Sequence, residues 1–219
     1  MKYLFALAAI FAALAIAEGS VPVRKQAPAW KGKAVKNGEI VDLASSDFKG
    51  KWLVLFFYPL DFTFVCPTEI VEFNNKYAEF KKLGAEVVGV SVDSPHTHLA
   101  WTRTDRKDGG LGSIDFPLLS DITKRISSSY GVLVEDEADE HFGVTMRGTY
   151  IIDPEGVVRS FAINDEPVGR NIDEVMRLLL AAQHAAANKG QGCPANWKKG
   201  DKTIKANRKD SLEFFKQWM

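Results

Sequence analysis

Short apolar runs alternate with segments of helical periodicity along the middle of this chain. Residues 34–35 and 39–43 suggest two short strands, and residues 52–58 (Trp-Leu-Val-Leu-Phe-Phe-Tyr) form a continuous apolar, aromatic-rich run. Such a run is typical of a strand that is buried on both faces in the middle of a sheet. From residue 66 to residue 83, apolar side chains recur at helical spacing, and Gly84 provides a stop. This part of the chain therefore predicts strand, loop and helix.

The same order repeats further along the chain. Residues 86–92 predict a second buried strand, Ser94-Pro95 indicates a helix start, and residues 99–106 continue with helical character. Residues 116–121 then predict a short strand followed by a helix cap, and the next helix runs toward Tyr130-Gly131.

A hairpin and a long helix complete the fold. Residues 148–152 and 157–161 predict paired strands joined by the turn Asp153-Pro154-Glu155-Gly156. Asn171 can cap a final helix with one apolar stripe, which we interpret as core rather than a cofactor site. The stripe comprises Ile172, Val175, Met176, Leu179 and Leu180. Alternating βα units followed by a hairpin and a helix predict an α/β fold, a thioredoxin-like sandwich with a central mixed sheet flanked by helices.

The two ends of the chain differ from this domain. Lys2 and the apolar run 3–17, which ends in Ala-Ile-Ala, predict a signal peptide (1–17) cleaved after Ala17, with an uncleaved anchor as the alternative. Residues 18–187 form the predicted domain. Residues 188–219, where Gly, Lys and Pro are frequent, predict an extended C-terminal arm that carries Cys193.

A signal peptide predicts the secretory pathway, either the endoplasmic reticulum lumen or export. No Lys-Asp-Glu-Leu-like ending follows Trp218-Met219, so lumenal retention is not encoded in the usual way. We expect no membrane attachment once the signal peptide is removed.

Composition narrows the function classes. The 219 residues carry 28 basic and 28 acidic side chains and are 46% hydrophobic, as in one ordinary globular domain. This balance does not suggest nucleic acid binding, and Lys198, Lys199 and Lys202 indicate a solvated surface. The four histidines are scattered and the two cysteines form no Cys-x-x-Cys pair, so we expect no metal site.

Cys66 is the most informative residue. Two cysteines in an exported chain would ordinarily form one structural disulfide. However, Cys66 follows an apolar run and precedes Pro67 and a helical pattern, which places it at a helix N-terminus. The unpaired N–H groups and partial positive charge there stabilise a thiolate, so the sequence predicts a nucleophilic sulfur.

Pro59, Thr63 and Cys66 fall in a Pro-x-x-x-Thr-x-x-Cys pattern with flanking aromatic residues, which resembles the active-site loop of the peroxiredoxins. Further motifs are similar, in order and spacing, to those of the typical two-cysteine subgroup. They are Gly89–Ser94, Thr97–Trp101, Gly109–Gly112, Arg147–Asp153, Val168–Arg170 and Cys193–Trp197.

The resemblance implies a thioredoxin-dependent peroxidase for hydrogen peroxide and organic hydroperoxides. Cys66 would be the peroxidatic nucleophile, and Arg147 would lie against it and the substrate, where its charge favours the thiolate and the transition state. Thr63 would position the peroxide, and Pro59 would shield the thiolate from water. Glu69 has two interpretations, a helix-dipole carboxylate or a partner that orients Arg147.

A second thiol is needed to resolve the sulfenic acid that forms on Cys66, and Cys193 is the candidate. The family implies that Cys193 comes from the partner subunit of a head-to-tail homodimer, and that dimers assemble into a pentamer of dimers; a static bond inside one chain is the alternative. Thioredoxin would reduce the disulfide, or a protein disulfide isomerase in a secretory lumen. No metal, flavin or haem is required, and the implied roles are antioxidant defence, redox homeostasis and peroxide signalling.

One motif departs from the family pattern. Overoxidation-sensitive members have a Gly-Gly-Leu-Gly loop, present here as Gly109–Gly112, and a Tyr-Phe pair in the tail, which here is Phe214-Phe215. Aromatic packing could still hold the tail over the Cys66 helix, but a hydrogen bond worth about 1 kcal/mol is lost. We therefore predict intermediate sensitivity to hyperoxidation.

Two other function classes are consistent with parts of the sequence. A general disulfide oxidoreductase would need a resolving cysteine near Cys66, and Cys66–Glu69 contains none. A ring-forming holdase would suppress aggregation even after Cys66→Ser, which distinguishes it from a peroxidase.

Overall fold

A computed structural model describes residues 20–218 of the chain, and the predicted signal peptide lies outside these described residues. The long strands in chain order are β1 (Lys31–Lys36), β2 (Glu39–Ala44), β3 (Trp52–Phe57), β4 (Ala85–Ser91), β5 (Leu118–Ser120), β6 (Arg147–Ile152) and β7 (Val158–Asn164). The helices are α1 (Cys66–Asn75), α2 (Tyr77–Lys82), α3 (Pro95–Arg103), α4 (Arg125–Ser129), α5 (Ile172–Ala187) and α6 (Arg208–Trp218). Two-residue strands β8 (Gln191–Gly192) and β9 (Ile204–Lys205) pair within the arm.

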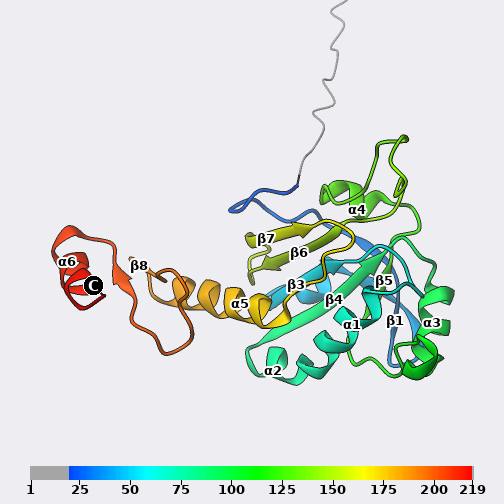
Figure 1. Cartoon of the computed structure of the whole chain (residues 1–219), viewed down its shortest axis with the longest axis horizontal. Helices are drawn as coiled ribbons and strands as arrows, with labels where there is room; N and C mark the ends of the chain where they lie inside the picture. The colour runs from blue at the N-terminus through cyan, green and yellow to red at the C-terminus, as the bar shows by residue number, and fades with distance from the viewer. Residues whose placement is uncertain (1–19, 219) are drawn as a thin grey trace, which may run out of the picture.

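Strands β1 to β7 form one mixed sheet in the order β2-β1-β5-β4-β3-β6-β7. Strand β3 pairs in parallel with β4 and antiparallel with β6, and β4 pairs in parallel with β5. The aromatic run of β3 therefore lies inside the sheet, as predicted. Figure 1 shows α4 on one side of this sheet and α1 and α2 on the other, which confirms the predicted thioredoxin-like α/β sandwich.

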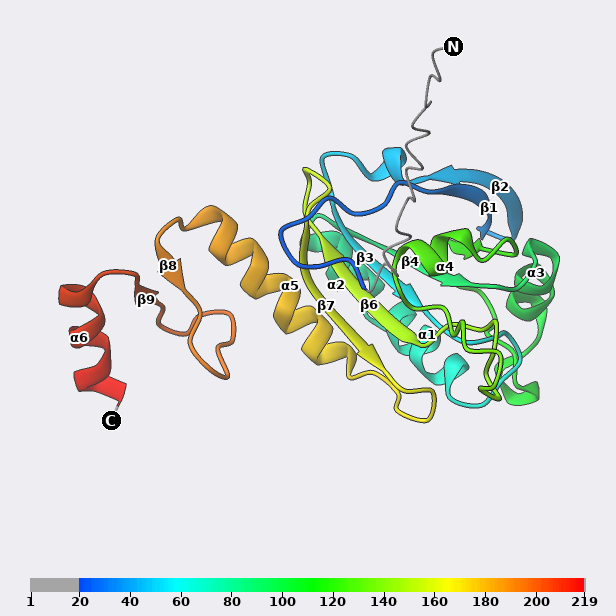
Figure 2. The ribbon, with the colours of Figure 1, turned by 90° about the horizontal axis from the view of Figure 1, so that it is seen from above.

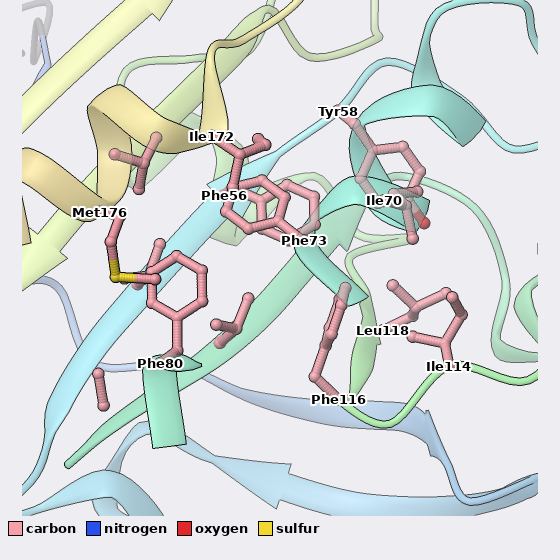
Figure 3. Packing of buried hydrophobic residues seen from close by; sticks show 14 of the residues in the cluster. Phe56, Tyr58, Ile70, Phe73, Phe80, Ile114, Phe116, Leu118, Ile172 and Met176 are labelled. Carbon is pink, nitrogen blue, oxygen red and sulfur yellow. The ribbon is translucent and has the colours of Figure 1, made fainter. Parts of the chain in front are cut away.

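The side of the sheet that faces α1 and α5 holds an aromatic core. Phe73 of α1 stacks on Phe56 of β3 with ring centroids 4.3 Å apart, and Phe116 meets Phe73 edge-on. Figure 3 shows these rings together with Ile172 and Met176, which reach in from α5. This packing fixes α1, and with it the first residue of that helix, against the middle of the sheet.

Most predicted elements are confirmed. The hairpin of β6 and β7 forms with a register shift between Ile151 and Ile152. Ser94 and Asn171 cap their helices, accepting bonds from the Thr97 and Glu174 N–H groups. The predicted stripe of α5 is buried, except that Leu180 is half-buried.

Two helical predictions need correction. The segment from Cys66 to Leu83 is not one helix, because α1 ends at Asn75 and α2 begins at Tyr77. Lys76 between them has ψ near 1°, and Asn74 uses its side-chain oxygen to accept a bond from the Asp115 N–H. Asparagine favours helix ends over helix interiors, while the apolar spacing continues across the break and hides it.

The second predicted helix is also shorter than expected. It ends at Arg103, with Thr104 in extended conformation, and only a single 3-10 turn (Arg106–Asp108) follows.

The C-terminal arm leaves the body at the end of α5. Figures 1 and 2 show α5 running outward from the sheet, with β8, β9 and α6 beyond it. Helix α6 was not predicted, and in this chain it lies far from α1 rather than over it. None of the helices within residues 20–218 is both long and apolar enough to span a bilayer.

Candidate active site

Cys66 is the first residue of α1 and is fully buried. Pro67 occupies the first turn, where its missing N–H needs no partner. The cap residue Val65 supplies no side-chain bond to the helix, but its carbonyl accepts the N–H groups of Thr68 and Glu69. The predicted position of the thiol at a helix N-terminus is therefore confirmed.

Arg147, the first residue of β6, lies directly against this thiol. Its Nη1 donates to Cys66 Sγ at 3.4 Å and to Glu69 Oε2 at 2.7 Å, and its side chain has no exposed surface. Burial disfavours the charged guanidinium, but the bond to Cys66 and the charge of Glu69 outweigh it, so that the pKa of Arg147 is raised. A permanent cation is thus fixed beside the sulfur.

Glu69 lies one turn after Cys66 and is also buried. Its Oε2 accepts from Arg147, and its Oε1 forms an ion pair with Arg170 Nη1 at 2.9 Å and accepts the backbone N–H of Arg170 at 2.8 Å. Of the two interpretations of Glu69, the geometry favours a partner that orients Arg147.

Arg170 was not among the site residues predicted from the sequence. Besides Glu69, it donates from Nε to Thr149 Oγ1 at 2.7 Å and from Nη2 to the carbonyls of Gly148 and Phe57. Burial lowers the pKa of Arg170 to about 10, against the opposing attraction of Glu69. The sequence signal was present, because Arg170 belongs to the Val168–Arg170 motif immediately before the cap of α5.

A second buried network supports the loop in front of Cys66. Asp61 accepts from the Tyr58 hydroxyl at 2.9 Å, and its other oxygen lies 2.7 Å from His98 Nδ1. The Asp61 N–H donates to Asp93 Oδ2. Burial raises the pKa of Asp61, and the bond with His98 opposes this. The loop is therefore tied to the end of β4 and to α3.

Thr63 and Pro59 lie in this loop on the N-terminal side of Cys66. Pro59 is buried, which suits a shielding residue. Thr63 is half-buried, and its hydroxyl donates a hydrogen bond to the Leu60 carbonyl at 2.8 Å. The hydroxyl oxygen can therefore still accept a hydrogen bond from a substrate.

Cys193 is not brought to Cys66 within this chain. Both cysteines are free, and Cys193 lies half-buried beside α5, on the arm that extends away from the sheet. Within residues 20–218, no three His, Cys, Asp or Glu side chains converge in a way that could hold a metal ion.

The chemistry of this site is specific. A buried thiol is held between a helix N-terminus and a guanidinium whose orientation a buried carboxylate fixes. Such a group of charges stabilises both a thiolate and the negative charge that grows on a leaving oxygen.

Comparison with known proteins gives one consistent result. The AhpC/TSA family matches residues 23–161, and the C-terminal domain of 1-Cys peroxiredoxin matches residues 181–217. Peroxiredoxin-4 of Dictyostelium discoideum is 55% identical over 195 residues, spanning 89% of this chain and 73% of that protein. Peroxiredoxin-2 of Macaca fascicularis is 53% identical over 200 residues, spanning 91% and 98%. The crystal structure of the reduced 2-Cys peroxiredoxin of Plasmodium vivax superposes with a TM-score of 0.83 at 40% identity, covering 89% of this chain and 98% of that one.

A thioredoxin-like fold that holds a buried thiol against an arginine, together with these relatives, defines an oxidoreductase of the thiol-dependent peroxidase class. With a family match over more than half of its length and relatives above half identity, the chain belongs to the AhpC/TSA family and is a peroxiredoxin.

Proposed function

We propose that this peroxiredoxin follows a two-cysteine cycle in which Cys66 is the peroxidatic residue and Cys193 of a second subunit is the resolving residue. The observation that supports Cys66 as the peroxidatic residue is the fully buried 3.4 Å contact between Arg147 Nη1 and Cys66 Sγ. An arginine at that distance favours the thiolate, which is the nucleophilic form of the residue.

In the first step, the Cys66 thiolate attacks one oxygen of hydrogen peroxide or an organic hydroperoxide. The O–O bond breaks, Cys66 becomes a sulfenic acid, and the leaving oxygen departs as an alkoxide or hydroxide that takes a proton from solvent. Arg147 stabilises the charge that grows on this oxygen. The Thr63 hydroxyl positions the peroxide, and buried Pro59 keeps water from the thiolate.

In the second step, the Cys193 thiol condenses with the sulfenic acid, which forms a disulfide and releases water. The outward direction of α5 supports a partner in another subunit, because β8, which ends next to Cys193, lies far from α1, which begins at Cys66 (Figure 2). A disulfide between two subunits would require at least a homodimer, and a pentamer of dimers is the assembly that we propose for the full protein.

In the third step, a dithiol protein reduces the disulfide by thiol exchange and is itself oxidised. A relative is named the mitochondrial thioredoxin-dependent peroxide reductase of Homo sapiens, 53% identical over 195 residues that span 89% of this chain and 74% of that protein. We therefore propose thioredoxin as the reductant, or a protein disulfide isomerase if the chain enters the secretory pathway as its first 17 residues predict. The cycle would serve antioxidant defence, redox homeostasis and peroxide signalling.

The test is to mix reduced protein with a small excess of hydrogen peroxide and to follow peroxide loss and non-reducing electrophoresis. We expect rapid peroxide loss and a disulfide-linked dimer that neither Cys66→Ser nor Cys193→Ser forms. Cys193→Ser should still consume one equivalent of peroxide, whereas Cys66→Ser should consume none. Equal peroxide consumption by Cys66→Ser would refute the assignment of the nucleophile.

A further inference from the structure

Arg147 has a second carboxylate partner besides Glu69. Glu166 lies in the loop between β7 and α5, and its backbone carbonyl accepts a hydrogen bond from Arg147 Nε. Its side-chain Oε1 also pairs with Arg147 Nη2 at 3.3 Å. Nη1 of the same guanidinium faces Cys66 Sγ and Glu69 Oε2. Arg147 is therefore shared between the sulfur and two carboxylates.

The two carboxylates hold Arg147 in different ways. The contact with Glu69 is 2.7 Å long and buried, whereas the contact with the Glu166 carboxylate is longer and partly exposed. A guanidinium is planar and rigid, so the bonds from Nε to the Glu166 carbonyl and from Nη1 to Glu69 already fix its plane. The Glu166 carboxylate therefore adds little to the orientation of Arg147, and its main contribution is its charge.

Glu166 changes the net charge around Cys66. Arg147, Arg170 and Glu69 form buried ion pairs that together carry two positive charges and one negative charge. A Cys66 thiolate would neutralise the remaining positive charge. Glu166 adds a second negative charge, so the cluster is already neutral before the thiol ionises. A negative charge that shares Arg147 with the sulfur disfavours the thiolate.

Glu166 is also the one member of these four charged side chains that solvent reaches. Its side chain is 34% exposed, whereas those of Arg147, Arg170 and Glu69 are at most 3% exposed. Because solvent screens a partly exposed charge, its effect on the sulfur should be modest. The charge at this position can be changed without breaking the buried ion pairs.

We infer that Glu166 is a positioning residue that moderates the reactivity of Cys66, because its carboxylate offsets part of the Arg147 charge that favours the thiolate. This inference deepens the proposed two-cysteine cycle and rests on it for its functional meaning. Loss of the Glu166 charge increases the fraction of Cys66 present as thiolate, the form that attacks the O–O bond. Glu166 itself takes no part in the bond changes of that step.

The experiment titrates Cys66 through its thiolate absorbance at 240 nm between pH 4 and 9. The parent for this experiment is the Cys193→Ser protein, in which Cys66 is the sole thiol, and the titration of a variant without cysteines is subtracted. Glu166→Gln removes the charge and keeps a hydrogen-bond acceptor, and Glu166→Ala removes both. Glu174→Gln is the matched control, because it neutralises a partly exposed carboxylate that pairs with Arg177 on α5.

The other charged groups of the cluster are the same in every variant. They are Arg147 on β6, Glu69 on α1, and Arg170 and Asp165 in the loop that carries Glu166. A difference between the Glu166 variants and the control therefore reports the Glu166 charge.

We expect Glu166→Gln and Glu166→Ala to lower the pH midpoint of the titration by roughly half a pH unit, which is about a threefold rise in the thiolate fraction below the midpoint. Glu174→Gln should titrate as the parent does. Below the parent midpoint, both Glu166 variants should react with hydrogen peroxide about threefold faster, and the rates should converge at a pH where the thiol is fully ionised. A merely structural role would not produce this convergence.

A midpoint in Glu166→Gln that equals that of Glu174→Gln, or that lies higher, would overturn the inference. A shift in Glu166→Ala alone would also overturn it, because the hydrogen bond to Arg147 would then matter rather than the charge. The titration uses no peroxide, so its result is independent of the proposed cycle. If no variant consumes peroxide, the proposed cycle fails while the shift in midpoint stands.

Discussion

The two cysteines occupy opposite kinds of environment. Cys66 has no exposed surface, belongs to the aromatic core cluster and accepts a charged hydrogen bond from Arg147. Cys193 is half-buried and is held by one long contact to a carbonyl and by the nearby Trp197. The first sulfur lies in the packed core of the molecule, and the second lies on its periphery.

This difference fits the roles that we propose for the two sulfurs. A nucleophile that cleaves a peroxide gains from charges that are already oriented when the substrate arrives. A sulfur that travels to another subunit, as in the proposed cycle, gains from a weak attachment, because segments with few buried contacts open at low free-energy cost. We therefore expect substitutions near Cys66 to have large effects and those in the arm to have small ones.

The largest expected difference is in stability. Phe73→Ala removes a fully buried ring that stacks on Phe56, and should lower the free energy of unfolding by about 3 to 5 kcal/mol. Phe215→Ala removes a ring of α6 that is 43% exposed, and should change it by less than about 0.5 kcal/mol. Urea unfolding of both variants measures this. Equal losses would mean that the arm is as firmly packed as the core.

The second difference compares two glutamates of α1. Glu69→Gln leaves Arg147 and Arg170 without their buried carboxylate and should cost about 3 kcal/mol of stability. Glu72→Gln, in the next turn, disturbs a partly exposed pair with Lys76 and an exposed bond from the Asn75 amide, and should cost less than about 1 kcal/mol. Thermal unfolding of the two variants provides the measurement, and similar shifts for both would show that the buried pairing is unimportant.

The third difference is catalytic. Arg147→Lys keeps a positive charge but loses the planar group that reaches Cys66 and Glu69 together, so the rate with hydrogen peroxide should fall about 100-fold. Arg159→Lys, in the neighbouring strand, changes a partly exposed pair with Asp153 and should leave the rate unaltered. Stopped-flow kinetics measures the rate of reaction with hydrogen peroxide in both variants. A drop of less than threefold in Arg147→Lys would contradict the role of the guanidinium.

The smallest difference concerns the loop network. Burial raises the folded-state pKa of Asp61 above its unfolded value, so folding favours the protonated carboxyl. This contribution to the free energy of unfolding is fully present below about pH 3.8, and it is lost as the pH rises through the folded-state pKa. The parent protein should therefore lose stability relative to Asp61→Asn as pH rises across this window, by about 1.4 kcal/mol for each pH unit that separates the folded and unfolded pKa values. Unfolding at a series of pH values measures the difference, with the exposed Asp42→Asn as control. A stability difference that stays constant, or that changes in favour of the parent protein, would contradict burial as the cause.

The sequence predicts the scaffold well because the scaffold depends on local pattern. The strand at residues 52–57 is buried on both faces, and a continuous apolar run signals that directly. The break at Lys76 leaves only a weak signal in the two preceding asparagines, since the apolar spacing of α1 continues into α2 and the contact of Asn74 with Asp115 is tertiary.

The site is predictable only in part, because some of its contacts depend on tertiary structure rather than on local sequence pattern. Cys66 and Arg147 stand in recognisable motifs, but the role of Arg170 depends on the loop between β7 and α5 returning beside Glu69 in three dimensions. Nothing in the local pattern around Asp61 and His98 indicates that they meet in the core. The position of Cys193 likewise depends on the packing of the arm against α5, which no periodicity specifies.

A fixed Cys66 and a movable Cys193 should meet only between subunits. The decisive experiment mixes Cys66→Ser and Cys193→Ser chains of different size, allows subunit exchange, adds hydrogen peroxide and separates the products without reductant. We predict a disulfide-linked heterodimer that contains one chain of each kind, and no disulfide in either variant alone. Failure to form this heterodimer, together with a parent protein whose Cys66–Cys193 bond lies within one chain, would show that the two cysteines do not meet between subunits.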